Sequence, residues 1–294
     1  MTQTVNHVFE LVGNTPMVRI NRMSPNPNVE IYAKLEWFNP TGSLKDRIAV
    51  KMIEEAEKEG KLTRDKTILE ATSGNTGISV AWVAALKGYK CTIVMPKSVS
   101  AERRKILRAL GAKLVFASTE AEAVAKAKEM AKNPKCFMPN QFANDENWKA
   151  HYENTGEEVW KQSWGRITHF VAGIGTSGTI MGVARKLKEY DKTVKIIGVQ
   201  PSQPDSKQQG LLNPQEFRPE IFDPEEIDEV ILVDDVDALK TARELLAKEG
   251  LFAGISSGAV MYGAMKKARE IEKGFIVALF ADHCFKYLST ELFR

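Results

Sequence analysis

The sequence predicts an α/β fold built from two doubly wound domains with mainly parallel sheets. Segments with helical periodicity alternate along the chain with short apolar runs rich in Val, Ile and Phe, and Gly or Pro punctuates the runs. This alternation is typical of a parallel sheet that is covered by helices on both faces. At about 150 residues per domain, a chain of 294 residues is expected to form two such domains.

The apolar runs and helices fall into two series, and each series predicts one sheet. The first series predicts strands at 67–69, 91–95 and 113–116, which precede helices at 75–87, 101–110 and 121–131. The second series predicts strands at 169–172, 195–199, 229–233 and 275–280, with helices at 179–189 and 237–249.

Two polar stretches interrupt this pattern. Residues 139–146 lie between the two series and lack clear periodicity, so we place the domain boundary there. Residues 200–226 are rich in Pro, Gln and acidic side chains, and a loop of this length in a compact domain is more often functional than idle.

The composition argues against nucleic-acid and metal functions. The formal net charge is +3, from 41 basic and 38 acidic residues without a block of like charge, which makes nucleic acid a poor candidate partner. Three widely spaced cysteines, Cys91, Cys136 and Cys284, indicate neither a disulfide framework nor a zinc site. The histidines show no metal-ligand spacing, so we expect no metal.

The apolar runs are also short. The longest, 80–86 and 275–281, fall far below the length that spans a membrane. The first residues lack the charged and apolar regions of a secretory leader. We therefore expect a soluble, cytoplasmic protein.

Three glycine-rich stretches stand at predicted helix starts: TSGNTG (72–77), GIGTSGTIMG (173–182) and GISSG (254–258). Glycine lets the backbone come close to a ligand, hydroxyls donate hydrogen bonds, and the unpaired amides of a helix start bind anions. Each stretch alone is also compatible with an ordinary capped helix start. Residues 173–178 fit the GxGxxG pattern, but no acidic residue ends the next strand, which disfavours a nicotinamide dinucleotide.

The stretch NPTGSLKDR (39–47) places Lys45 after a Gly-Ser turn, at the start of a helix that continues through Met52 and Glu55. The positive end of a helix disfavours the ammonium form of a lysine, which suits an amine that forms a Schiff base. A solvated helix lysine is the ordinary alternative for any single lysine.

Taken together, these motifs resemble the fold-type II pyridoxal-phosphate enzymes, and within them the cysteine synthases, or O-acetylserine sulfhydrylases. The resemblance covers nearly the whole chain, through VGNTPMVRI (12–20), NPTGSLKDR (39–47), EATSGNTG (70–77), RRKILRALGA (103–112), NQF (140–142), GIGTSGT (173–179), GISSGA (254–259) and KYLST (286–290). It is closest to the sulfhydrylase B branch, which includes forms that use O-phosphoserine or a sulfur carrier protein.

The resemblance assigns roles to individual residues, with pyridoxal 5′-phosphate as the cofactor. Lys45 becomes the Schiff-base lysine and catalytic residue, and Asn75 the partner of the ring hydroxyl. The substrate carboxylate is bound by Thr72, Ser73, Asn75, Thr76 and Gln141. The cofactor phosphate lies on Gly175, Thr176, Ser177, Gly178 and Thr179. Ser256 faces the pyridine nitrogen, which a neutral serine cannot keep protonated as an aspartate would.

The resemblance also implies a domain division and a reaction. Residues 1–12 and 35–147 form a smaller mobile domain, residues 13–34 and 148–294 the larger phosphate-binding domain, and the cofactor lies in the cleft between them. The expected reaction is a β-replacement that converts O-acetyl-L-serine, or O-phospho-L-serine, and sulfide to L-cysteine. The resemblance implies sulfide or a thiocarboxylate carrier as the source of sulfur, and the family suggests a homodimer.

Three alternatives remain open from the sequence. A β-eliminating cysteine desulfhydrase and a serine/threonine dehydratase have the same fold, and a non-catalytic binding protein would be expected to have lost Lys45. The loop 201–220 has no arginine in its central part, only Lys207 and Arg218 towards its ends, which favours O-acetylserine over a phosphorylated donor. We expect this loop to act as a mobile lid. Cys284 replaces a glycine common in relatives, at a cost of about 1 kcal/mol if the backbone there is left-handed.

Overall fold

The computed structural model describes residues 4–203, 205–212 and 218–294. The chain forms two compact units. The larger unit comprises the chain up to Leu44 together with Asn147–Arg294, and the smaller unit comprises Lys45–Glu146. Among the described helices, none combines the length and the apolar character that a membrane crossing requires.

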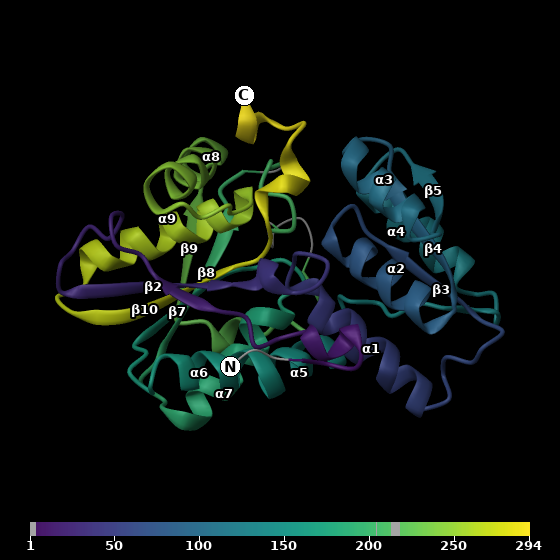
Figure 1. Cartoon of the computed structure of the whole chain (residues 1–294), viewed down its shortest axis with the longest axis horizontal. Coiled ribbons are helices and arrows are strands. Elements are labelled where there is room, and N and C mark those ends of the chain that lie inside the picture. Colours follow the sequence, from purple (N-terminus) through teal and green to yellow (C-terminus); the bar gives the residue numbers. More distant parts are fainter. Residues whose placement is uncertain (1–3, 204, 213–217) are drawn as a thin grey trace. The chain divides into compact units, whose positions relative to one another are not determined.

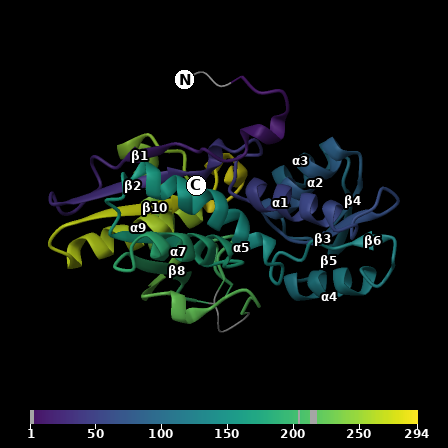
Figure 2. The same cartoon turned by 90° about the horizontal axis from the view of Figure 1, so that it is seen from below.

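The smaller unit is a four-stranded parallel sheet between helices. The strands lie in the order β5-β4-β3-β6 and have the bounds β3 (Thr67–Ala71), β4 (Lys90–Pro96), β5 (Lys113–Ala117) and β6 (Cys136–Phe137). The helices are α1 (Lys45–Lys58), α2 (Asn75–Lys87), α3 (Ala101–Ala109) and α4 (Glu120–Met130). Figure 2 shows α4 on one face of the sheet and α1 and α2 on the other. The strands and helices predicted for the first series are thus confirmed.

The larger unit is a six-stranded sheet in the order β1-β2-β10-β7-β8-β9, in which only the β1–β2 pair is antiparallel. The strands are β1 (Met17–Arg19), β2 (Val29–Leu35), β7 (His169–Gly173), β8 (Lys195–Pro201), β9 (Glu229–Val233) and β10 (Gly274–Phe280). The main helices are α5 (Glu146–Ala150), α6 (Glu157–Gln162), α7 (Gly178–Tyr190), α8 (Asp235–Glu244) and α9 (Ile255–Glu270). A π-helical turn, η3 (His151–Gly156), joins α5 to α6.

Helices cover both faces of this larger sheet, with α8 and α9 on one side and α6 and α7 on the other (Figure 1). Alternate strand residues supply the two cores, because side chains along a strand point to opposite faces. Val171 and Ile197 pack with α8 and α9, whereas Phe170 and Ile196 pack with α7. The fold is therefore the α/β arrangement with doubly wound, mainly parallel sheets that the sequence predicted.

The division between the units differs from the expected one. Residues 4–12 and 35–44 were expected in the smaller domain but belong to the larger unit. Hydrogen bonding holds residues 35–44 there: Leu35 pairs with Phe280 at the end of β10, Ser43 forms a bridge with Asp282, and the Leu44 amide donates to Ala281 O. The second expected boundary, after residue 147, lies one residue earlier in the structure.

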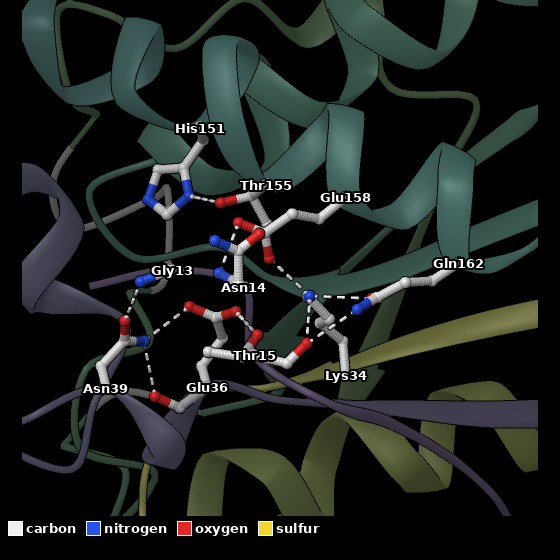
Figure 3. A network of polar contacts seen from close by, with 10 residues as sticks. All are labelled: Gly13, Asn14, Thr15, Lys34, Glu36, Asn39, His151, Thr155, Glu158 and Gln162. Atoms are coloured by element: carbon white, nitrogen blue, oxygen red, sulfur yellow. Dashed lines mark hydrogen bonds and ion pairs between the residues drawn. The ribbon is translucent and has the colours of Figure 1, made fainter. Parts of the chain in front are cut away.

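A buried polar network fixes the chain that leads towards Lys45 (Figure 3). The fully buried Lys34 Nζ donates to Thr15 O at 2.7 Å, to Glu158 Oε2 at 2.6 Å and to Gln162 Oε1 at 2.8 Å. Thr15 Oγ1 donates to the buried carboxylate of Glu36 at 2.7 Å. These bonds join the end of β2 to the loop before β1 and to α6. The segment that follows β2 and leads to Lys45 therefore starts from a fixed position.

Candidate active site

Lys45 is the first residue of α1, and its two neighbours in the chain are fixed. Before it, the Leu44 amide donates to Ala281 O at 3.0 Å. After it, the fully buried Asp46 accepts a hydrogen bond from Ser79 Oγ at 2.6 Å. The lysine itself is half-buried. Its backbone position is therefore fixed on both sides, while its side chain keeps the reach of four methylene groups.

The glycine-rich loop of the smaller unit ends at an open helix start. The N-cap of α2 is Gly74, which has no side chain and therefore makes no side-chain capping bond. Thr72 Oγ1 accepts the Gly74 amide at 3.1 Å, and Thr76 Oγ1 donates to Gln141 Oε1 at 2.6 Å. The sequence-predicted residues of this loop and Gln141, which is far away in the chain, thus lie at one site that suits a carboxylate.

The second glycine-rich loop joins β7 to α7 in the larger unit. Its last residue, Ser177, is the N-cap of α7 in a left-handed conformation (φ 73°) and makes no capping bond. Among the described residues, the buried Ser177 hydroxyl has no hydrogen-bond partner. A buried hydroxyl without a partner is costly unless a ligand satisfies it. An uncapped helix start beside such a donor fits a phosphate group.

Two side chains behind this loop were missed by the sequence analysis. Asn147 Nδ2 donates to Thr176 Oγ1 at 3.0 Å, and His151 Nε2 lies 3.2 Å from Thr179 Oγ1. His151 Nδ1 in turn lies 2.9 Å from Thr155 Oγ1 (Figure 3). Asn147 and His151 are four residues apart, and this helical spacing is the signal that could have indicated a shared face. His151 thus supports a threonine of the predicted phosphate loop.

Packing rather than ligand approach explains two of the glycines in the same loop. A Cβ on Gly178 would lie 1.8 Å from Asn147 Oδ1, and one on Gly175 would lie 2.0 Å from Gly210 O. A side chain at position 175 would therefore collide with backbone, and one at position 178 would have to displace the Asn147 side chain, whether or not a ligand is bound.

Ser256 is the second residue of α9, and it is buried. The N-cap of α9 is Gly254, again without a side-chain acceptor, and its amide donates to Asp282 O at 3.0 Å. Asp282 also bridges Ser43, two residues before Lys45. The segment 281–284 therefore runs between the turn that leads to Lys45 and the helix start that carries Ser256. The carboxylate loop belongs to the other compact unit.

The residue that departs from the family pattern, Cys284, begins the 3₁₀ turn η6 (Cys284–Tyr287). It is not among the residues with positive φ, so the cost expected for a left-handed backbone does not arise. Burial is the largest cause that raises the pKa of the Cys284 thiol, to about 11, which keeps it protonated near neutral pH.

The predicted lid, 201–220, is described only in part, because residues 204 and 213–217 lie outside the described residues. Lys207 Nζ donates to both carboxylate oxygens of Glu291, at 2.8 and 2.7 Å. The Lys207 amide donates to Asp235 Oδ2 at 2.9 Å. The guanidinium of Arg218 lies 5.8 Å from the ring centroid of Phe222. The cation nearest the centre of this loop therefore already has a carboxylate partner.

Comparisons with known proteins agree on one family. The family model described as pyridoxal-phosphate dependent enzyme matches residues 8–282. Cysteine synthase B of Salmonella typhimurium is 43% identical over 98% of this chain and 96% of its own length. A cysteine synthase structure from Entamoeba histolytica superposes with a TM-score of 0.94 at 35% identity, over 99% of this chain and 91% of its own. A hydrogen sulfide-producing enzyme from Fusobacterium nucleatum superposes with a TM-score of 0.93 at 42% identity, over 97% of this chain and 100% of its own.

Proposed function

Because the chain belongs to the pyridoxal-phosphate-dependent enzymes, and within them to the cysteine synthases of the B branch, we propose that it joins sulfide to the three-carbon skeleton of an activated L-serine. The product is L-cysteine, and the cofactor is pyridoxal 5′-phosphate. One observation carries the proposal: three helix starts, at Asn75, Gly178 and Ile255, have N-caps that make no side-chain capping bond. They coincide with the three glycine-rich motifs.

The first two helix starts fit two anionic groups. The residues Gly175–Thr179 would hold the cofactor phosphate, with the Ser177 hydroxyl as a donor and Thr176 and Thr179 held from behind. Thr72, Ser73, Asn75, Thr76 and Gln141 would bind the carboxylate of the amino acid, with Asn75 also beside the ring hydroxyl. Both assignments use the same physics, the attraction of an anion to the positive end of a helix.

The third helix start fits a neutral ring nitrogen. Ser256 would face that nitrogen from the first turn of α9, where the positive helix end disfavours a proton on the ring. When bound, the cofactor supplies an electron sink that weakens the bonds at the α-carbon of an amino acid. A sink with an unprotonated ring is weaker, which favours departure of a group from the β-carbon over reactions that need a long-lived carbanion.

Lys45 would have two tasks. Its Nζ would hold the cofactor covalently in the resting enzyme and, once released by the substrate amine, accept the α-proton of the substrate. The fixed neighbours Leu44 and Asp46 keep the helix start in place while the side chain changes partners. The thiol of Cys284 is no competing nucleophile, because burial raises its pKa.

O-acetyl-L-serine is our proposed donor. A phosphorylated donor would call for a cation directed at its β-substituent, and Lys207 is instead bound to Glu291. We propose sulfide as the sulfur source, because the cysteine synthase relatives imply it, and a homodimer as the assembly on family resemblance alone.

A second candidate is sulfide release from L-cysteine by β-elimination. The observation that favours it is the similarity to the sulfide-producing enzyme from Fusobacterium nucleatum. The same carboxylate loop and lysine would serve this reaction, since it begins with the same removal of an α-proton.

An assay of the purified holoenzyme with each donor, with and without sulfide, separates these functions. The proposal expects L-cysteine from O-acetyl-L-serine and sulfide, at a higher kcat/KM than from O-phospho-L-serine. Faster release of sulfide and pyruvate from L-cysteine than synthesis of cysteine would instead support the second candidate. No turnover of any of these amino acids would contradict both.

The phosphate assignment is tested by Ser177→Gly. The substitution removes one donor to a charged group, which should weaken cofactor affinity about tenfold. It also relieves the left-handed backbone of a non-glycine residue, so the apoprotein should be as stable as the wild type or more stable. Asp205→Gly, at another residue with positive φ, is the matched control and should leave cofactor affinity unchanged. Unchanged affinity in Ser177→Gly would show that the phosphate lies elsewhere.

A further inference from the structure

One buried acid in the smaller unit has no part in the site as assigned so far. Glu70 lies in β3 and is 2% exposed. Its neighbours Leu69 and Ala71 pack with α4, so the Glu70 side chain points to the opposite face of the sheet. Burial of a carboxyl group is costly unless hydrogen bonds compensate for it, so the position of Glu70 calls for a reason.

The hydrogen bond of Glu70 lies beside the carboxylate loop. Strand β6 pairs with β3 only through Thr67 and Ile68, and beyond Phe137 the ladder stops. The chain then turns at Asn140, in a left-handed conformation (φ 54°), and the Asn140 amide donates to Glu70 Oε2 at 3.1 Å. The Asn140 amide thus donates to the Glu70 side chain, where a longer ladder would offer it a backbone carbonyl of β3.

The residue after Asn140 is Gln141, whose Oε1 accepts the hydrogen bond from Thr76. Gln141 is 3% exposed and Thr76 2%. The turn is closed on its other side by the amides of Ala143 and Asn144, which both donate to Asn140 O. Two hydrogen bonds therefore connect the Glu70 carboxyl to the helix start assigned to the substrate carboxylate: Asn140 to Glu70, and Thr76 to Gln141.

We propose that Glu70 is a positioning residue for substrate binding: it holds the Asn140 amide and thereby sets where Gln141 meets Thr76. The inference rests on the proposed carboxylate-binding role of this loop. The partner it names is the α-carboxylate of the amino-acid substrate, which Glu70 affects without touching it.

Few buried charged or titratable groups lie on the strand and helices next to Glu70. From β4, Cys91 lies on the same face, and burial followed by the Glu70 charge raises the pKa of its thiol to about 12. Helix α2 has no charged residue before Lys87, whereas α1 carries the buried Asp46, which accepts a hydrogen bond from Ser79, and the buried Arg47. Burial raises the pKa of Glu70 to about 8, against the hydrogen bonds from the amides of Asn140 and Ala71. A neutral glutamine can therefore replace it as an acceptor.

The test compares Glu70→Leu, which has no acceptor, with Glu70→Gln, which keeps one. In the holoenzyme, Glu70→Leu should raise the KM for O-acetyl-L-serine about tenfold, the effect of a lost positioning contact, with little change in kcat or in the KM for sulfide. Glu70→Gln should restore a KM near that of the wild type. Glu57→Gln, in the same unit but away from the turn, serves as the control and should behave as the wild type.

A binding measurement keeps this inference separate from the proposed function. The spectral change of the bound cofactor gives the affinities for L-serine and L-serinamide, which differ in the carboxylate. Glu70→Leu should lose much of the wild-type preference for L-serine, whereas an equal loss for both compounds would overturn the inference. Failure of the proposed function appears differently, as a wild type that prefers L-serine yet makes no cysteine.

A third measurement needs no variant. The Asn140 amide in the wild type should exchange with solvent deuterium far more slowly than the amides of the surface turn 132–135. Equally fast exchange would show that Glu70 does not hold the turn, and it would overturn the inference even if Glu70→Leu did not fold.

Discussion

Lys45→Ala is expected to lower kcat for cysteine formation by about a thousandfold or more, because one substitution removes both the covalent anchor of the cofactor and the base that takes the α-proton. The fold should persist. Alanine is the best helix former, and the neighbours Leu44 and Asp46 keep their own hydrogen bonds. Steady-state kinetics and the absorbance of the bound cofactor measure the two losses separately.

Borohydride reduction of the wild type, followed by peptide mapping, should place the cofactor on Lys45. The matched control is Lys58→Ala at the other end of α1, where the side chain is exposed and pairs with Glu55. Its loss should leave kcat unchanged, because exposed ion pairs contribute little. A label on any other lysine, or full activity of Lys45→Ala, would contradict the assignment.

Glu70→Gln is expected to change how stability depends on pH. The pKa of Glu70 is raised in the folded protein from 4.5 to about 8, mainly by burial, so between these values the folded state holds a proton that the unfolded state releases. The stability of the wild type must therefore fall as pH rises, by about 1.4 kcal/mol per pH unit for this one group. Glu70→Gln has no such proton. Its free energy of unfolding relative to that of the wild type should therefore increase by about 4 kcal/mol from pH 5 to pH 8.

Thermal unfolding midpoints of both proteins across this range measure the effect. Glu57→Gln is a control of opposite sign. Burial, the largest single cause, raises the pKa of Glu57, but hydrogen bonds from Lys87 and Tyr89 outweigh it and the pKa is lowered. Its stabilising effect is thus present above the unfolded pKa and lost as pH falls. Parallel stability curves for wild type and Glu70→Gln would show that Glu70 is ionised in the folded protein throughout.

The sequence predicted the elements well because their signals are local. Apolar runs and helical periodicity located strands such as β4 and helices such as α2 within a few residues. Spacing could not reveal what depends on tertiary contacts. Three contacts join segments that lie far apart in the sequence: Asn147 packs against Gly178, His151 supports Thr179, and Glu70 accepts the amide of Asn140.

The division implied by the resemblance differs from the two compact units for a similar reason. Nothing in residues 35–44 indicates that they stay with the larger unit, because the partners of Ser43 and Leu44, residues 281–282, lie more than two hundred residues later in the sequence. Local polarity placed a boundary within residues 139–146, and the resemblance placed it after residue 147; the smaller unit ends at Glu146.

The pairing of β2 with β10 also bears on the order in which the chain can fold as it is synthesised. Residues 29–35 leave the ribosome early, but their parallel partner, residues 274–280, is among the last to emerge. The whole of Lys45–Glu146 is complete long before that, and its sheet uses only its own strands. The smaller unit can therefore fold during synthesis, whereas the edge of β2 that pairs with β10 stays unpaired until the end of translation.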